Sequence, residues 1–301
     1  MLFRSQKTAA GQFMLVFGRS TETKGVTKLA WEAVPVTETS LAYFARSPAA
    51  RLPTDRRLPY FARYLEHPEP LIADDAYLEF GHAPYDKVRL VAKDLPMEKI
   101  RLWVVDPNIP QFRKGFYGLA LGLATNEKDR QANALVLRKI IDTPASDFRQ
   151  GFDGVLAGYL IAEEPTALTY IETRYLADPK SQAGDVRHVL AALRFYYEYG
   201  DHTQAKRLAA ALAKLLARRE FAAEVVTDLA RWQHWQALDT VAALYTYDRD
   251  TTLAIRRAVV GYLIACPNQA ADAALDKLRR GDPKGVDKAE QYHRQLRALS
   301  E

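Results

Sequence analysis

The pentapeptide Gly-Tyr-Leu-Ile-Ala occupies residues 158–162 and returns unchanged at residues 261–265, 103 positions later. An Asp-Pro pair follows each copy, at Asp178-Pro179 and Asp282-Pro283. Three units of about 34 residues fit this spacing, and such a period is typical of helical hairpins that stack on one another. The sequence therefore predicts an all-α fold, an α-α superhelix built from repeated pairs of helices.

The likeness between the two copies extends over one helical face. Around each pentapeptide, apolar residues recur with the spacing of a helix that is buried along one side. These positions are Phe152, Val155, Leu156, Tyr159 and Leu160 in the first copy and Ile255, Ala258, Val259, Tyr262 and Leu263 in the second. A weaker version of the same stripe, at Phe112, Phe116, Leu119 and Leu123, predicts a further helix buried through these residues.

Partner helices are expected between these segments, over residues 126–142, 165–177, 203–219, 221–231 and 268–280. The breaks between them carry helix-stop and helix-start residues, including proline, which fits the first turn because its missing N–H has no intrahelical partner there. The connections are short, so successive helices should pack antiparallel. Glycines within the helical segments around residues 118 and 158 indicate close approach between helices rather than a nucleotide-binding loop.

The first forty residues have a different pattern. Residues 12–17 form a short apolar run, residues 29–36 partly alternate, and the polar stretch between them holds two glycines. This pattern predicts a β-hairpin with a long connection. We therefore divide the chain into a small β element over residues 1–40 and a helical repeat domain over residues 41–301.

Composition limits the class of protein and its location. The formal net charge of +5 is spread along the 301 residues without a long block of one sign, so it favours solubility and identifies no partner. Cys266 is the single cysteine, which excludes a disulfide within the chain, and its place at the end of an apolar stripe predicts burial. The chain as given shows neither a signal peptide nor an apolar run of about 18 residues, so we expect a cytoplasmic protein without a membrane segment.

The segment Leu71–Phe80 resembles the first helix of a HEAT-type repeat, in which aliphatic positions precede an acidic residue and a small-aliphatic run. More broadly, residues 55–300 resemble uncharacterised bacterial proteins with degenerate HEAT-like repeats. Several units lack the mid-helix proline and the Asp/Arg ladder of regular HEAT stacks. The resemblance implies an α-α superhelix, similar to armadillo-type stacks, whose concave side binds proteins, peptides or nucleic acid.

The most distinctive chemical feature of the second half is the aromatic cluster at residues 231–235. On a continuous helix its two tryptophans lie on one side, three residues apart, where they would either stack on a base or alkyl cation or fill space between repeats. A tyrosine-rich run at residues 195–199 and a basic side of the helix predicted at 203–219 are further candidate surfaces. Exposed aromatic and arginine side chains carry much of the energy of interfaces. The predicted partner-binding residues are Tyr197, Arg218, Arg231, Trp232 and Trp235.

The sequence assigns no catalytic, cofactor-binding or metal-ligating residue. Common hydrolase and nucleotide-binding motifs are absent. The Glu-x-x-His pairs Glu79/His82 and Glu290/His293 have the spacing of di-iron carboxylate bundles, but they lie far apart and are interpreted as solvated helix polarity. We predict a non-catalytic scaffold that binds a protein or peptide, of open oligomeric state. The alternative is a nucleic-acid-binding protein or a repair enzyme similar to HEAT-like alkylpurine DNA glycosylases, for which Asp228 and Asp239 are the carboxylates nearest the tryptophans.

Overall fold

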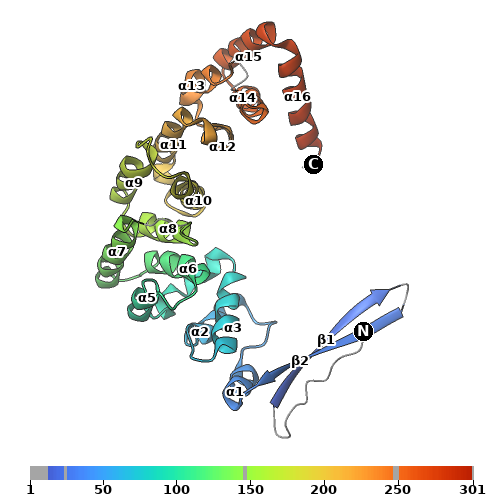
Figure 1. The fold of residues 1–301 in the computed structure, drawn as a ribbon, viewed down its shortest axis with the longest axis vertical. Coiled ribbons are helices and arrows are strands. Elements are labelled where there is room, and N and C mark those ends of the chain that lie inside the picture. Colours follow the sequence, from blue (N-terminus) through green and yellow to red (C-terminus); the bar gives the residue numbers. More distant parts are fainter. Residues whose placement is uncertain (1–12, 24–25, 145–147, 247–250, 300–301) are drawn as a thin grey trace. The chain divides into compact units, whose positions relative to one another are not determined.

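The computed structural model describes residues 13–23, 26–144, 148–246 and 251–299. It confirms a predominantly helical fold with one small β-hairpin near the N-terminus (Figure 1). Contacts within the chain group residues into two units, Met1–Glu98 and Lys99–Glu301, which are described separately. The boundary at residue 40 stays a prediction.

The β-hairpin of the first unit pairs β1 (Phe13–Thr23) with β2 (Val26–Val36) in antiparallel register. Both strands run through the polar stretch in which we predicted a long connection, so that prediction is wrong. The stretch holds three threonines and a valine, whose branched side chains favour extended backbone. Gly18 lies opposite Trp31, and a Cβ added to Gly18 would lie 2.9 Å from Cζ3 of that ring. Glycine there leaves room for the indole.

Short helices complete the first unit. They are α1 (Glu38–Arg46), α2 (Thr54–Ala62), α3 (Pro70–Gly81), α4 (Tyr85–Leu90) and the 3-10 turn η1 (Ala92–Asp94). Thr37 caps α1 by accepting a hydrogen bond from the backbone N–H of Ser40, and the Ser40 hydroxyl accepts one from the backbone N–H of Thr37 in return. Helix α1 contacts both strands and α3, and Tyr43 on its buried side donates a hydrogen bond to Asp75.

The second unit is a succession of helical hairpins, entered through α5 (Met97–Trp103). Its elements are α6 (Gln111–Gly122), α7 (Glu127–Asp142), α8 (Phe152–Ala162), α9 (Thr166–Ile171) with the π turn η2 (Glu172–Leu176), α10 (Ala183–Tyr199), η3 (His202–Gln204), α11 (Ala205–Ala213), η4 (Lys214–Ala217), α12 (Arg219–Arg231), η5 (Trp235–Ala237), α13 (Leu238–Ala243), α14 (Leu253–Ala265), α15 (Gln269–Gly281) and α16 (Pro283–Ala298).

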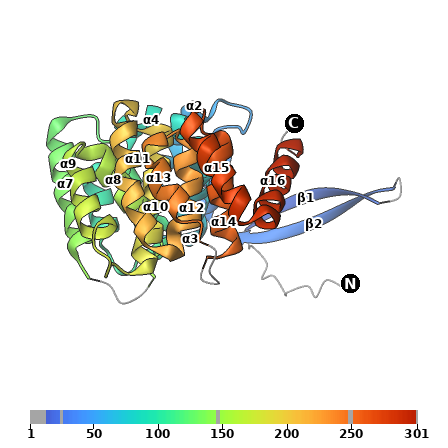
Figure 2. The same cartoon turned by 90° about the horizontal axis from the view of Figure 1, so that it is seen from above.

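These helices form two layers. The even-numbered helices α6 to α16 make the first layer, and α7, α9, α11, α13 and α15 make the second (Figure 1). Within the first layer α8 packs on α6 and α10, and α14 packs on α12 and α16. In the second layer α7, α11 and α15 each pack on two first-layer helices, α9 packs on α8, and α13 packs on α14. Seen from above, the helices of this unit run roughly alongside one another, as antiparallel hairpins require (Figure 2).

The two identical pentapeptides occupy equivalent places in this stack. The first lies in α8 and the second in α14, both in the first layer and three hairpins apart, which confirms the predicted period. All five predicted positions of the first copy are buried, and in the second copy only Ala258 is partly exposed. Each tyrosine reaches back to the preceding hairpin: the Tyr159 hydroxyl accepts a hydrogen bond from Arg138, and the Tyr262 hydroxyl donates one to the His234 carbonyl.

Glycines bring α6 and α8 into backbone contact. A Cβ added at Gly118 would lie 2.6 Å from the Cα of Val155, and one added at Gly122 would lie 2.7 Å from the Cα of Gly158. Contacts this short are not tolerated by real Cβ atoms, so larger residues would force the two helices apart. The glycines meet in the same order along both helices. Helices α6 and α8 therefore run parallel, as alternate members of a series of antiparallel hairpins must.

Two expectations about the helices are wrong. Residues 221–231 do not form a partner helix of the second layer, because α12 packs on α14 in the first layer and η5 with α13 takes the partner role. The stripe predicted to bury α6 is also displaced. Tyr117 and Leu121 are the large apolar residues buried in that helix. Of the predicted stripe, Leu123 is buried, whereas Phe112 remains 46% exposed and Phe116 and Leu119 are half-buried.

Arginine–carboxylate pairs join successive hairpins, although the sequence pattern did not indicate a ladder. Arg101 contacts Asp129 at 2.8 Å, Arg149 contacts Asp185 at 2.8 Å, Arg194 contacts Asp228 at 2.6 Å and Arg256 contacts Asp282 at 3.5 Å. The partners in these pairs are between 26 and 36 residues apart in sequence. The spacing varies with the length of each hairpin, so the ladder has no fixed sequence period.

Candidate functional site

A groove of about 420 Å³ lies between three first-layer helices, α6, α8 and α10. We call it the glycine groove. It is lined by Phe112, Gly115, Phe116, Leu119, Gln150, Gly151, Asp153, Gly154, Ala157, Ala191, Ala192 and Phe195. Gly115 packs against Gly151 and Gly154 where α6 meets α8, and Phe112, Phe116 and Phe195 supply an aromatic lining. Because Phe112, Phe116 and Leu119 are not buried in the core, they present an apolar face to this groove.

Asp153 is the one charged residue that lines the glycine groove. Its carboxylate contacts Nδ1 of His188 at 3.3 Å, and His188 is 6% exposed and packs against Phe148 with ring centroids 4.5 Å apart. The hydrogen bond from His188 holds the pKa of Asp153 below its usual value, so the carboxylate is negatively charged at neutral pH. The groove therefore combines an apolar surface with a single fixed anion, an arrangement suited to an apolar segment that carries a cation.

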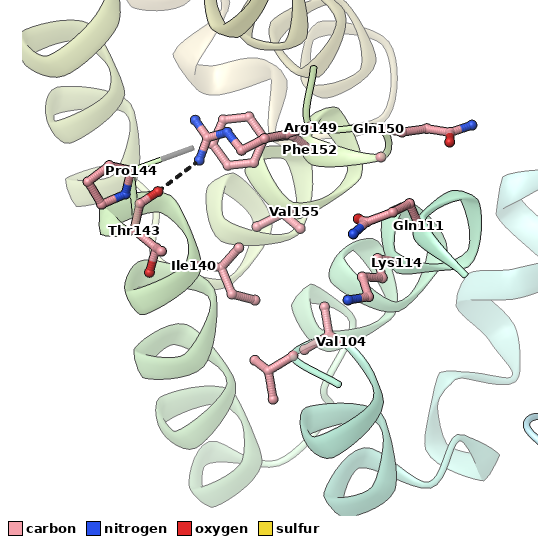
Figure 3. A pocket seen from close by; sticks show the side chains of 12 residues that line it. Val104, Gln111, Lys114, Ile140, Thr143, Pro144, Arg149, Gln150, Phe152 and Val155 are labelled. Carbon is pink, nitrogen blue, oxygen red and sulfur yellow. Dashed lines mark hydrogen bonds between the residues drawn. The ribbon is translucent and has the colours of Figure 1, made fainter. Parts of the chain in front are cut away.

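A second cavity, of about 310 Å³, adjoins the groove at Gln150 and Gly151 (Figure 3). We call it the Lys114 pocket. Val104, Ile140 and Val155 form apolar walls that come from the segment after α5, from α7 and from α8. The side chains of Gln111 and Lys114 enter from α6, three residues apart and therefore on one face of that helix (Figure 3).

Arg149 lines one side of the Lys114 pocket, and its guanidinium is held by contacts within the protein. Its guanidinium lies 3.4 Å from the centroid of the Phe152 ring, contacts Asp185 at 2.8 Å and donates a hydrogen bond of 3.3 Å to the Thr143 carbonyl (Figure 3). This charge is neutralised within the protein. Arg149 therefore serves to hold the start of α8 rather than to attract a ligand.

The charge of Lys114, unlike that of Arg149, is not paired with a carboxylate among the described residues. Burial lowers the pKa of its ammonium group, and the charge of Asp106 only partly opposes this effect. In the described part of the chain no carboxylate lies within ion-pair distance of Lys114. A cation that is partly desolvated and lacks an ion-pair partner is electrostatically unfavourable unless an anion binds beside it.

The two tryptophans of the predicted partner-binding set do not share a helix, so the geometry assumed for them is wrong. Helix α12 ends at Arg231, and Gln233 has a left-handed backbone with φ of 55°. The N–H of His234 bonds the Leu229 carbonyl at 2.9 Å, which closes the helix end. Trp235 then begins the turn η5.

Both indoles pack against tyrosines of neighbouring hairpins. Trp232 is 8% exposed and stacks on Tyr197 with centroids 4.2 Å apart and ring planes 10° from parallel. Trp235 is half-buried and meets the Tyr262 ring edge-on at 5.1 Å. Arg231 is exposed. The structure thus separates Arg231 from a stacked internal pair, and partner binding by these residues stays a prediction.

Arg218 lies outside the basic face on which it was predicted, because the helix through residue 213 gives way to η4 and Arg218 precedes α12. It contacts Glu220 at 2.7 Å, donates a hydrogen bond of 3.0 Å to the Ser181 carbonyl and lies over the Phe221 ring. The predicted basic neighbour Lys214 pairs with Glu172 at 2.5 Å. These cations join hairpins to one another.

The carboxylates weighed for catalysis or metal binding also have structural partners. Asp228 is 3% exposed and accepts a hydrogen bond from Arg194, and Asp239 is exposed. Glu79 binds Arg57 and Glu290 binds Arg279. Over the residues that the structure describes, no group of three or more His, Cys, Asp or Glu side chains is arranged to hold a metal ion. None of the described helices combines the length and apolar character needed to cross a membrane.

Comparison with known proteins adds little. No protein-family model matches the chain, and no curated protein matches it. Among solved structures, human deoxyhypusine hydroxylase in complex with glycerol aligns over 80% of this chain and 97% of its own, with 14% identity and a TM-score of 0.33. A similarity at this level carries no inference about activity.

Sequence reasoning missed both cavities. The signal for the groove was present as two sets of glycines with the same spacing, at 115, 118 and 122 and at 151, 154 and 158. The signal for the pocket was weaker, because a single lysine on a helix is usually solvated. Its surroundings come from three separate helices, which no local pattern connects.

Proposed function

We propose that the chain is a non-catalytic, HEAT-like repeat scaffold that binds a protein or peptide partner in the glycine groove. The observation that carries this proposal is the apolar face of α6. Phe112, Phe116 and Leu119 have the spacing of a buried stripe, yet they line an open groove instead of the core. An apolar helix face that lines a groove, with one of its rings 46% exposed, is the kind of surface on which an amphipathic segment docks.

The groove favours a particular partner chemistry. Its aromatic lining suits an apolar segment, and the glycines and alanines beside it add no bulky side chain to the groove. Asp153 supplies the only charge, so a lysine or arginine of the partner would pair with it. We therefore propose an apolar peptide segment with one basic residue as the ligand, rather than a nucleic acid, whose phosphates Asp153 would repel.

Selection from a displayed peptide library against the intact chain tests this function. We expect enriched peptides to combine aromatic or aliphatic residues with a basic residue. Their affinities are then measured by fluorescence anisotropy. Phe112→Ala and Phe195→Ala should each weaken binding by about 2 kcal/mol, or about thirtyfold in Kd, if these rings are central contacts. Asp153→Asn should selectively weaken peptides that carry the basic residue.

The matched control is Leu135→Ala, since Leu135 is 73% exposed on the second-layer helix α7 and lies outside the groove. It should leave the Kd of the same peptides unchanged. Equal affinity of wild type, Phe112→Ala and Phe195→Ala would contradict the groove as the binding site. Failure to enrich any sequence with an apolar core would contradict the proposed partner chemistry.

A further inference from the structure

The Lys114 pocket has features that peptide binding in the glycine groove does not explain. Its volume of about 310 Å³ lies at the lower end of the range for small-molecule sites. Most of its wall is apolar; Gln111 and Lys114 enter it from one turn of α6, and Thr143 and Arg149 line another side (Figure 3). This combination of a mainly apolar lining with a few convergent polar groups is typical of a small-ligand site.

We propose that the Lys114 pocket binds a small organic carboxylate with an apolar tail. The carboxylate pairs with Nζ of Lys114 and accepts a hydrogen bond from the amide of Gln111, and the tail packs among Val104, Ile140 and Val155. Both polar side chains point into the space between these apolar residues (Figure 3).

The charge state of the pocket selects the anion. Arg149 is already paired with Asp185, so it adds no net charge for a ligand to neutralise. Lys114 has no carboxylate within ion-pair distance among the described residues, and burial of its ammonium is unfavourable without a counter-charge. A bound carboxylate supplies that counter-charge. A neutral apolar molecule would leave the ammonium unpaired, and a cation would be repelled by it.

The volume of the pocket fits a ligand with one short apolar chain. Apolar walls come from the segment after α5, from α7 and from α8, and the glycine contacts hold α8 against α6, the helix that carries Lys114. The pocket is an open-sided cavity whose volume suits a short aliphatic or aromatic body. Octanoate is a suitable probe because it carries one carboxylate on an unbranched apolar chain, and 1-octanol is its uncharged counterpart.

Isothermal titration calorimetry on the intact chain tests the proposal. We expect octanoate to bind with a stoichiometry near one and 1-octanol to bind at least tenfold more weakly. Lys114→Met keeps an apolar stem but removes the charge, so it should weaken octanoate binding by about tenfold or more. Octanoate affinity of the wild type should also fall as pH rises through the lowered pKa of Lys114, because only the protonated amine pairs with the carboxylate.

The control is Lys139→Met, because Lys139 is an exposed lysine on α7 next to the pocket residue Ile140. It should leave octanoate binding unchanged. Far-UV circular dichroism of both variants establishes that they are folded, and Phe195→Ala, which changes only the glycine groove, should still bind octanoate. Octanoate binding that survives Lys114→Met, equal affinity for 1-octanol, or no binding heat at millimolar octanoate would each overturn the proposal.

Discussion

The same substitution in two identical pentapeptides should have different consequences. In Gly158→Ala the new methyl group would lie 2.8 Å from the carbonyl carbon of Gly118 and 3.3 Å from the Cα of Leu119, both backbone atoms of α6. In Gly261→Ala it would meet the imidazole of His293, whose Nδ1 lies 3.2 Å from the added atom. A side chain can rotate away, whereas the backbone of a packed helix cannot.

The magnitudes follow from these neighbours. Overpacking costs about 1–3 kcal/mol, and we place Gly158→Ala near 3 kcal/mol because the methyl group pushes on main chain. Replacing a helical glycine by alanine returns about 1 kcal/mol of helix propensity, which leaves a net loss of about 2 kcal/mol. In Gly261→Ala the same gain offsets the loss of the hydrogen bond between His293 and the Arg257 carbonyl, also about 1 kcal/mol. Its net effect should be near zero.

Thermal unfolding followed by circular dichroism at 222 nm measures both changes. For a unit of about 200 residues, a loss of 2 kcal/mol corresponds to a decrease in Tm of about 4–8 °C. Gly184→Ala is the control for helix propensity alone, because the atom nearest to its new methyl group is Cδ2 of Phe148 at 3.8 Å. Equal stabilities of Gly158→Ala and Gly261→Ala would refute the inference that α6 and α8 are in backbone contact.

Two further expectations concern hydroxyl and carboxylate groups in the second unit. Tyr262→Phe should lower the free energy of unfolding by about 1–2 kcal/mol, because it leaves the His234 carbonyl without its 2.7 Å hydrogen bond. Tyr159→Phe removes only the 3.4 Å hydrogen bond from Arg138 and should cost less. Urea midpoints that show the reverse order would contradict this reasoning. The hydrogen bond from His188 lowers the folded-state pKa of Asp153. The stabilisation from this hydrogen bond is therefore complete above the unfolded-state pKa of about 3.9 and is lost as pH falls through the folded-state pKa. Urea midpoints measured between pH 5 and 2.5 should decline less in Asp153→Asn than in wild type, and parallel declines would contradict this prediction.

The repeat could be predicted from sequence because the apolar spacing that defines it lies within single helices. The apolar spacing around each pentapeptide depends only on helical periodicity, and both copies bury the predicted face. Cys266 was likewise predicted to be buried and is 5% exposed. Predictions of this kind succeed when one helix face determines the outcome.

The tryptophan cluster could not be predicted because the helix end lacks its usual signal. Helices commonly end with glycine in the left-handed conformation, and here Gln233 takes that position. Its N–H bonds the Ala230 carbonyl at 3.1 Å, and the next N–H, that of His234, bonds Leu229. A glutamine is not a sequence signal for a left-handed helix end. A continuous helix was therefore assumed, and Trp232 and Trp235 were placed on one face.

The glycine groove shows how two apolar patterns compete on one helix. In α6 the aromatic stripe through Phe112 and Phe116 and the glycine stripe through Gly118 point in different directions, and the glycine stripe faces α8. The backbones of α6 and α8 can approach this closely only along the glycines, so the glycine stripe faces α8 and fixes the orientation of the helix. The aromatic stripe is then left at the edge of the contact, where α10 completes the groove. In α14 the equivalent glycine, Gly261, is covered by the His293 ring, so the same pentapeptide meets a side chain there instead of a neighbouring backbone. The glycine spacing shared by α6 and α8 is thus the feature from which the position of the groove follows.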